Sequence, residues 1–104
     1  MSDVKVDFES EAWQATARGA RHKVVERAGK RFRLAEFGTE FVEPDWCLKG
    51  HVGYVLEGHL ELELEDRVER VGPGDGFVIR PGGVEKHKAR AVGATARVVL
   101  VEDV

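Results

Sequence analysis

The sequence is poor in the features that mark several large classes of protein. It contains one cysteine and three prolines among 104 residues. A single cysteine cannot form a disulfide within the chain, and it suits a reducing compartment. No apolar run approaches the ~18 residues of a membrane-spanning helix, and the first seven residues contain no apolar segment of the secretory type. We therefore expect a cytoplasmic protein with no membrane partner.

Positive charge is not in excess either. The chain has 16 Lys and Arg against 19 Asp and Glu, a net charge of -3. Proteins that bind nucleic acids gather basic side chains on one face, so we expect no nucleic-acid partner. The length is that of one domain. We expect residues 1–104 to form it, with an N-terminal extension over residues 1–20 and a β-barrel over residues 21–103.

Short alternating runs predict a chain built of strands. In the clearest of them, residues 60–65, three leucines alternate with three glutamates, as in a strand with one buried face. Similar runs cover residues 23–27, 32–37, 77–79, 87–92 and 95–101, and turn residues separate them. About eight short strands with a turn every 8–12 residues predict an all-β sandwich or barrel with little or no helix.

The stretch from Asp45 to Gly58 contains most of the side chains able to bind a metal. If it is one extended strand, Asp45, Cys47, His51 and Glu57 share a face, because side chains alternate along a strand. Thiolate, imidazole and carboxylate are the protein ligands of transition metals. The pattern therefore predicts that this surface points into the barrel.

Residues 53–58, Gly-Tyr-Val-Leu-Glu-Gly, are followed by alternating strands, Pro-Gly-Asp at 73–75, Ile-Arg-Pro-Gly-Gly at 79–83 and then His87. In this order the chain resembles a small single-domain cupin of the cupin type 2, RmlC-like group, over roughly residues 34–101. The resemblance implies a jelly-roll barrel, or double-stranded β-helix, with a short N-terminal extension. It does not name a reaction, because cupins include dioxygenases, isomerases, epimerases, sensors and storage proteins.

The metal-binding motif of the family is degenerate here. Its first part has two histidines separated by one residue, then a glutamate, then a glycine seven positions later. Counting back from Gly58 places His51 at the glutamate position. The two histidine positions then hold Asp45 and Cys47, or Pro44 and Trp46 if the gap is one residue longer.

The second part of the motif contributes one further histidine. Its expected position holds Lys86, and one inserted residue in the loop brings His87 into register. The resemblance thus implies His51, His87 and Cys47 as the ligands of a divalent transition metal such as Zn, Fe, Ni or Mn. A site of two histidines and a carboxylate would need Asp45 or Glu57 as well.

Other residues are weaker candidates. Arg80, Lys86 and Tyr54 are possible contacts for a ligand near the mouth of the barrel. His22, between two basic residues, is interpreted as a surface residue. Two structural alternatives stay open: the histidines are interior groups bonded to backbone or water, or Cys47 is a small buried apolar residue.

Two functions are consistent with these residues. The first is a metal-dependent cupin, of dioxygenase or isomerase type if it is an enzyme, that acts on a small polar or anionic molecule inside the barrel. The alternative is a non-catalytic cupin that has lost the metal and binds a small ligand. Metal content discriminates between the two. We also expect a homodimer, as the resemblance implies.

Overall fold

Strands dominate the computed structural model, which describes residues 4–104 and confirms the predicted all-β class. A single turn of 3₁₀ helix, η1 (Phe8–Ser10), precedes them. Within the described residues, no helix is long and apolar enough to cross a membrane. The strands are β1 (Gln14–Ala17), β2 (Ala20–Arg27), β3 (Lys30–Phe37), β4 (His51–Glu57), β5 (Leu60–Glu63), β6 (Val68–Val71), β7 (Gly76–Ile79), β8 (Lys88–Ala91) and β9 (Ala96–Asp103).

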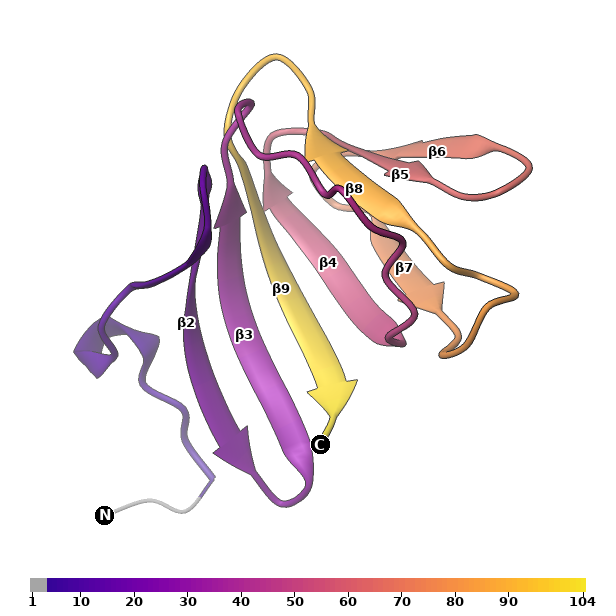
Figure 1. Ribbon diagram of the computed structural model, residues 1–104. Helices are drawn as coiled ribbons and strands as arrows, with labels where there is room; N and C mark the ends of the chain where they lie inside the picture. The colour runs from indigo at the N-terminus through magenta and orange to yellow at the C-terminus, as the bar shows by residue number, and fades with distance from the viewer. Residues whose placement is uncertain (1–3) are drawn as a thin grey trace.

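The strands form two antiparallel sheets. The large sheet has the order β1-β2-β3-β9-β4-β7, and the small sheet has the order β6-β5-β8. Figure 1 shows the large sheet as one curved wall, with β5, β6 and β8 beyond its β4 side. The chain leaves the large sheet after β4, returns to it at β7, and closes it again with β9 between β3 and β4. This is the predicted jelly roll.

Alternation along the strands divides the interior into an apolar and a polar end. Along β9, Ala96, Val98 and Leu100 are buried, and the next inward residue is Glu102. The apolar end is a continuous core, because seven buried side chains contact one another there: Ala35, Val55, Leu60, Ala91, Ala96, Val98 and Leu100. The site lies beyond this core, where the inward positions become polar.

The N-terminal segment packs on the outside of the large sheet. β1 pairs with β2 through a tight turn, so part of the expected N-terminal extension adds an edge strand to the large sheet. Phe8 packs edge-on against Phe32 with ring centroids 5.0 Å apart, and Lys23 Nζ donates to the Phe8 carbonyl at 2.8 Å. The expectation for residues 1–3 lies outside the described residues.

The segment 38–50, between β3 and β4, runs beside β8 and helps to close the barrel (Figure 1). The Glu43 carboxylate accepts a hydrogen bond from the Ala89 N–H at 2.7 Å. Cys47 and His87 exchange two backbone hydrogen bonds, of 2.8 and 3.1 Å, as a bridge between antiparallel chains does. This segment therefore holds the cysteine at a fixed place beside the small sheet.

The prediction of one strand from Asp45 to Gly58 is wrong, since β4 begins only at His51. At Gly50 the chain passes directly against Pro81: an added Cβ would lie 2.8 Å from Pro81 Cδ. The close approach separates the Cys47 bridge from the strand that follows it. Cys47 and His51 therefore reach the interior from two different elements.

Two glycines in left-handed conformation provide a matched test of the fold. Gly58 ends β4 at φ +75°, and a Cβ there would overlap the Thr95 carbonyl oxygen. Gly93 has φ +80° with no atom within 4 Å of an added Cβ. We expect Gly93→Ala to cost ~1 kcal/mol of unfolding free energy from backbone strain, and Gly58→Ala a further ~1–3 kcal/mol from the clash. Urea unfolding measures both, and equal losses would contradict the packing described.

Candidate metal centre

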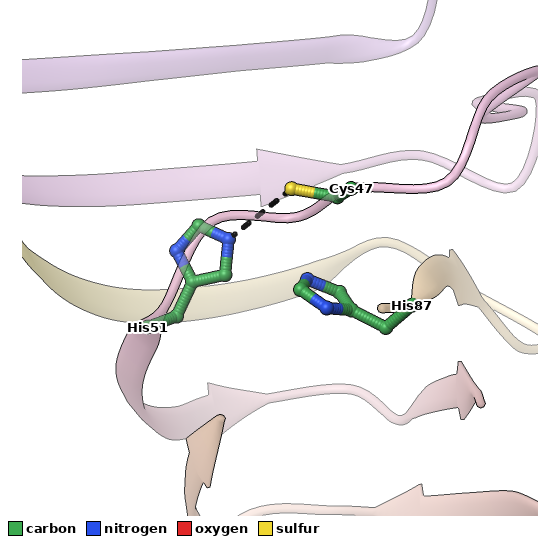
Figure 2. Close-up of side chains that lie close together, drawn as sticks. All are labelled: Cys47, His51 and His87. Carbon is green, nitrogen blue, oxygen red and sulfur yellow. Dashed lines mark hydrogen bonds between the residues drawn. The ribbon is translucent and has the colours of Figure 1, made fainter. Parts of the chain in front are cut away.

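Three side chains converge in the polar half of the barrel. Cys47 comes from the segment 38–50, His51 is the first residue of β4, and His87 directly precedes β8. Their ligand atoms all lie within 4.8 Å of one another. Figure 2 shows the Cys47 sulfur directed toward the His51 ring, with His87 on the facing side. Cys47 Sγ is 3.7 Å from His51 Nε2, and the two imidazole centroids are 5.2 Å apart at an interplanar angle of 78°. The structure thus brings together the three residues that the cupin motif implied.

The second nitrogen of each imidazole faces an acceptor. His51 Nδ1 lies 2.9 Å from a carboxylate oxygen of Glu102, and His87 Nδ1 lies 3.1 Å from the Glu85 carbonyl oxygen. Since a carbonyl only accepts, His87 carries its proton on Nδ1. His51 Nδ1 lies beside the Glu102 carboxylate without an aligned hydrogen bond. Nε2 of His87 then has a lone pair, which is the arrangement of a metal-binding histidine with its supporting acceptor, and Nε2 of His51 faces the Cys47 sulfur at 3.7 Å.

Glu102 is a buried carboxylate at the back of the site, with 7% of its surface exposed. Its second oxygen lies 2.9 Å from Arg33 Nε, so the guanidinium supplies the counter-charge that a buried carboxylate requires. Neither the Arg33 Nε–H nor the His51 Nδ1–H is directed along the line to its oxygen, so both are close charge contacts without linear hydrogen bonds. One carboxylate therefore holds an arginine and a candidate ligand together.

Burial lowers the pKa of His51 to about 4. The nearby Glu102 carboxylate opposes this shift, while His87, Arg33 and Lys49 add to it. The His51 imidazole is therefore neutral near pH 7. Neutral imidazole is the form that binds a metal, so the folded site holds this ligand in the competent state without prior loss of a proton.

A cavity of about 700 Å³ extends from this cluster between the two sheets. Its volume is within the usual range of small-molecule sites. The end next to the apolar core is lined by Phe37, Leu60 and Phe77. Leu62, Ile79 and Leu100 also line the cavity, with Ile79 paired to His51 and Leu100 paired to Arg33. The opposite end is polar and, beside the cluster itself, is lined by His22, Glu26, Arg31, Arg33, Lys49 and Glu102.

Among the polar lining residues that were not predicted from the sequence are His22, Arg33 and Glu102. The interpretation of His22 as a surface residue is wrong, because it lines the cavity with Nδ1 3.4 Å from an Arg33 NH1 nitrogen. Strand parity was the available signal, since Glu102 follows Leu100 by two positions and must face the same way. No such signal was available for His22, because the residues on either side of it are basic and point outward.

The two carboxylates proposed to complete a ligand set do not join the cluster. Asp45 borders the cavity but is exposed, and it is outside the group of converging ligand atoms. Glu57 is exposed, so its predicted inward orientation is wrong. The pairing of β4 with β9 shifts register between Val55 and Glu57. Such an irregularity reverses the alternation beyond it.

The three weaker ligand contacts lie away from the cavity lining. Tyr54 is 49% exposed on the outer face of β4. Arg80 Nε lies 3.3 Å from a carboxylate oxygen of Glu85. Lys86 Nζ lies 2.8 Å from a Glu65 carboxylate oxygen, at the outer rim of the small sheet. Each of the two cations is thus already paired with a carboxylate.

The donors of the cluster suit a transition metal. Zinc bonds of ~2.3 Å to sulfur and ~2.0 Å to nitrogen place the donors of a tetrahedral site about 3.3–3.6 Å apart. The 3.7 Å between Cys47 Sγ and His51 Nε2 is close to this separation. Three protein donors also leave at least one coordination position for a ligand.

The fold and the site together define a class: a small antiparallel jelly roll with a partly buried Cys/His/His cluster facing its cavity. The Cupin domain model matches residues 49–102, more than half of the chain, so the chain belongs to the cupin family. None of the curated proteins matches it.

Solved structures agree with this assignment. KdgF from Halomonas sp. is 27% identical, with a TM-score of 0.74 over 92% of this chain and 89% of that one. The polyketide cyclase RemF from Streptomyces resistomycificus is 25% identical, with a TM-score of 0.75 over 95% and 78%. The Fe(II) form of HppE has a TM-score of 0.77 over 98% and 62%, and its 11% identity shows the fold alone.

The lowered pKa of His51 predicts a loss of stability in acid for the metal-free protein. Between pH 6.5 and about 4, His51 binds a proton in the unfolded chain but not in the folded one. The free energy of unfolding is therefore highest above pH 6.5, as far as this residue is concerned, and decreases as the pH falls toward 4. The loss amounts to at most ~3 kcal/mol. Urea unfolding at a series of pH values should show a shallower decline for His51→Asn, and an unchanged slope would contradict the assignment.

Proposed function

We propose that this cupin binds a divalent transition metal through Cys47, His51 and His87, and that it acts on a small polar or anionic molecule in the cavity. The observation that carries the proposal is the convergence of three donors within 4.8 Å, with an acceptor at Nδ1 of each histidine. A reducing cytoplasm suits a site that depends on a free thiolate. Iron, zinc, nickel and manganese are the candidate metals, and the sulfur and imidazole donors favour them over magnesium and calcium.

The bound metal would supply a Lewis acid able to polarise a carbonyl group or to activate water or dioxygen. The protein residues have separate tasks. The Glu85 carbonyl orients His87 through Nδ1, and the Glu102 carboxylate supplies a negative charge beside Nδ1 of His51. The apolar end of the cavity excludes water from the body of the ligand. That RemF, at 25% identity, is a polyketide cyclase supports chemistry on a small organic molecule in this kind of barrel.

Metal content tests the proposal directly. We expect tag-free protein, purified without added metal, to contain close to one equivalent of transition metal by elemental analysis. The variant His51→Ala/His87→Ala should lose it, because removal of two of three donors leaves only Cys47. Cys47→Ser should weaken retention by at least about tenfold, since a hydroxyl is a poor substitute for thiolate.

His59→Ala is the matched control for this experiment. His59 is exposed and outside the cluster, so its removal should leave the metal content unchanged. If the wild-type protein contains no metal and takes up no Fe(II), Ni(II) or Zn(II) when offered, the metal-dependent function is wrong. The cavity would then be that of a non-catalytic ligand-binding cupin.

We infer further that two copies of the chain associate through the outer face of the large sheet. Val52, Tyr54 and Val78 are 52%, 49% and 74% exposed on β4 and β7, and Val101 pairs with Val52 on β9. Such an apolar centre is typical of homodimer interfaces. In a two-fold dimer the same surface of each subunit meets its copy, so the contact depends on apolar area and not on attraction between opposite charges. The N-terminal segment covers the β3 side of this face but not the β4 side, where the exposed residues lie.

Val52→Lys/Tyr54→Lys tests the dimer. We expect the wild-type protein to have the mass of a dimer by light scattering after gel filtration, and the variant that of a monomer, because two charges would be buried in each face. Val68→Lys, at a residue 57% exposed on β6 of the small sheet, should leave the mass unchanged. A wild-type monomer at all accessible concentrations would refute the interface.

A further inference from the structure

Arg33 has more hydrogen-bond donors than partners. A guanidinium carries five N–H groups. Its contacts among the described residues are the Glu102 carboxylate at Nε, 2.9 Å away, and His22 Nδ1 at one NH1 nitrogen, 3.4 Å away. The side chain is only 17% exposed and lines the cavity. Among the described residues, Nε is the one atom of this side chain that is fully buried without an aligned hydrogen bond, so the terminal N–H groups open to the cavity and are available to a ligand with oxygen atoms.

His22 adds a donor beside this guanidinium. Because arginine can only donate, His22 Nδ1 must accept from Arg33 NH1. Burial lowers the pKa of His22, and the positive charges of Arg33 and Arg31 lower it further against the opposing effect of Glu102. The neutral ring then carries its proton on Nε2. His22 also lines the cavity, so this N–H and the guanidinium belong to the same wall, formed by β2 and β3.

The other arginine of the cavity does not compete for this role. Arg31 Nε lies 2.7 Å from a Glu26 carboxylate oxygen and donates a hydrogen bond to it. Nε of Arg31 thus has a hydrogen-bond acceptor, whereas Nε of Arg33 has no aligned hydrogen bond. The cavity therefore has two Arg/Glu pairs. Of the two arginines, Arg33 is the more buried, with 17% of its side chain exposed against 34% for Arg31, and its terminal N–H groups are available to a ligand.

We propose that Arg33 and His22 bind a carboxylate group of the ligand, which makes a small carboxylic acid the class of molecule that this cavity takes. Two parallel N–H groups of a guanidinium match the two oxygens of a carboxylate. The remainder of the ligand reaches toward the apolar end lined by Phe37 and Phe77. Binding of the carboxylate by Arg33 and His22 does not depend on the proposed function. What rests on the proposed function is that the reacting end of the acid lies at the Cys47, His51 and His87 cluster, which Glu102 connects to Arg33.

Metal-free protein tests this without any activity assay. The probes are 4-fluorobenzoate and its neutral analogue 4-fluorobenzamide, followed by ¹⁹F NMR line broadening during titration. We expect the acid to bind at least about tenfold more tightly than the amide, as charge-assisted hydrogen bonds require. In Arg33→Gln/Glu102→Gln, which removes both charges together, binding of the acid should weaken about 10- to 100-fold.

The matched control is Arg31→Gln/Glu26→Gln, which removes the second Arg/Glu pair from the same wall and should change binding less than about threefold. His22→Gln, which leaves Arg33 and Glu102 in place, should weaken binding of the acid several-fold even if the double variant fails to fold. Equal binding of acid and amide, no binding of the acid, or binding unchanged in the Arg33 variant and in His22→Gln would each overturn the proposal.

The same titration separates this inference from the proposed function. If the acid binds only to zinc-loaded protein, and equally well without Arg33, the carboxylate belongs to the metal: the metal site stands and the inference fails. If the acid binds through Arg33 to a protein that takes up no metal, the inference holds for the carboxylate and the metal-dependent function fails.

Discussion

The buried charge of Glu102 is the constraint on which the rest of the site depends. Its carboxylate lies 2.9 Å from Arg33 on one side and 2.9 Å from His51 on the other. A buried charge without partners costs several kcal/mol, so the fold must keep Arg33 and His51 beside this carboxylate. The arginine comes from β3, the carboxylate from β9 and the histidine from β4. Three neighbouring strands of the large sheet are thereby tied together at the point where the apolar core gives way to the cavity.

The small sheet contributes through backbone rather than charge. Cys47 and His87 reach the same point because their main chains are hydrogen-bonded to each other, so the spacing of two donors is set by an antiparallel bridge. His51 arrives from the opposite sheet. The cluster therefore spans the two layers, and a bound metal would link them. Metal binding at this site would therefore stabilise the barrel, since a site that exists only in the folded chain adds its binding free energy to folding.

Much of this was predictable from the sequence, and the failures have physical causes. The run of leucines and glutamates at 60–65 identified a half-buried strand, and Leu60, Leu62 and Leu64 are buried. The cupin motif implied three residues that the structure does bring together. Glu57 was assigned to the wrong face because a register shift leaves no trace in a period-two pattern. Arg33 and Glu102 were missed because their partners are distant in sequence, and pairing between strands of a jelly roll is set by topology.

The charge of the cluster bears on the metal site proposed for this degenerate motif. The family pattern of three histidines and one glutamate gives a metal one negative ligand. Here the glutamate position holds neutral His51, and Cys47 stands at a histidine position. Bound to a metal as a thiolate, it would restore one negative charge, and a divalent ion in the site would keep a net charge of about +1. One fewer protein donor leaves an additional open position. Both features favour an anionic ligand with an oxygen donor, and a carboxylic acid anchored at Arg33 could present one to the metal.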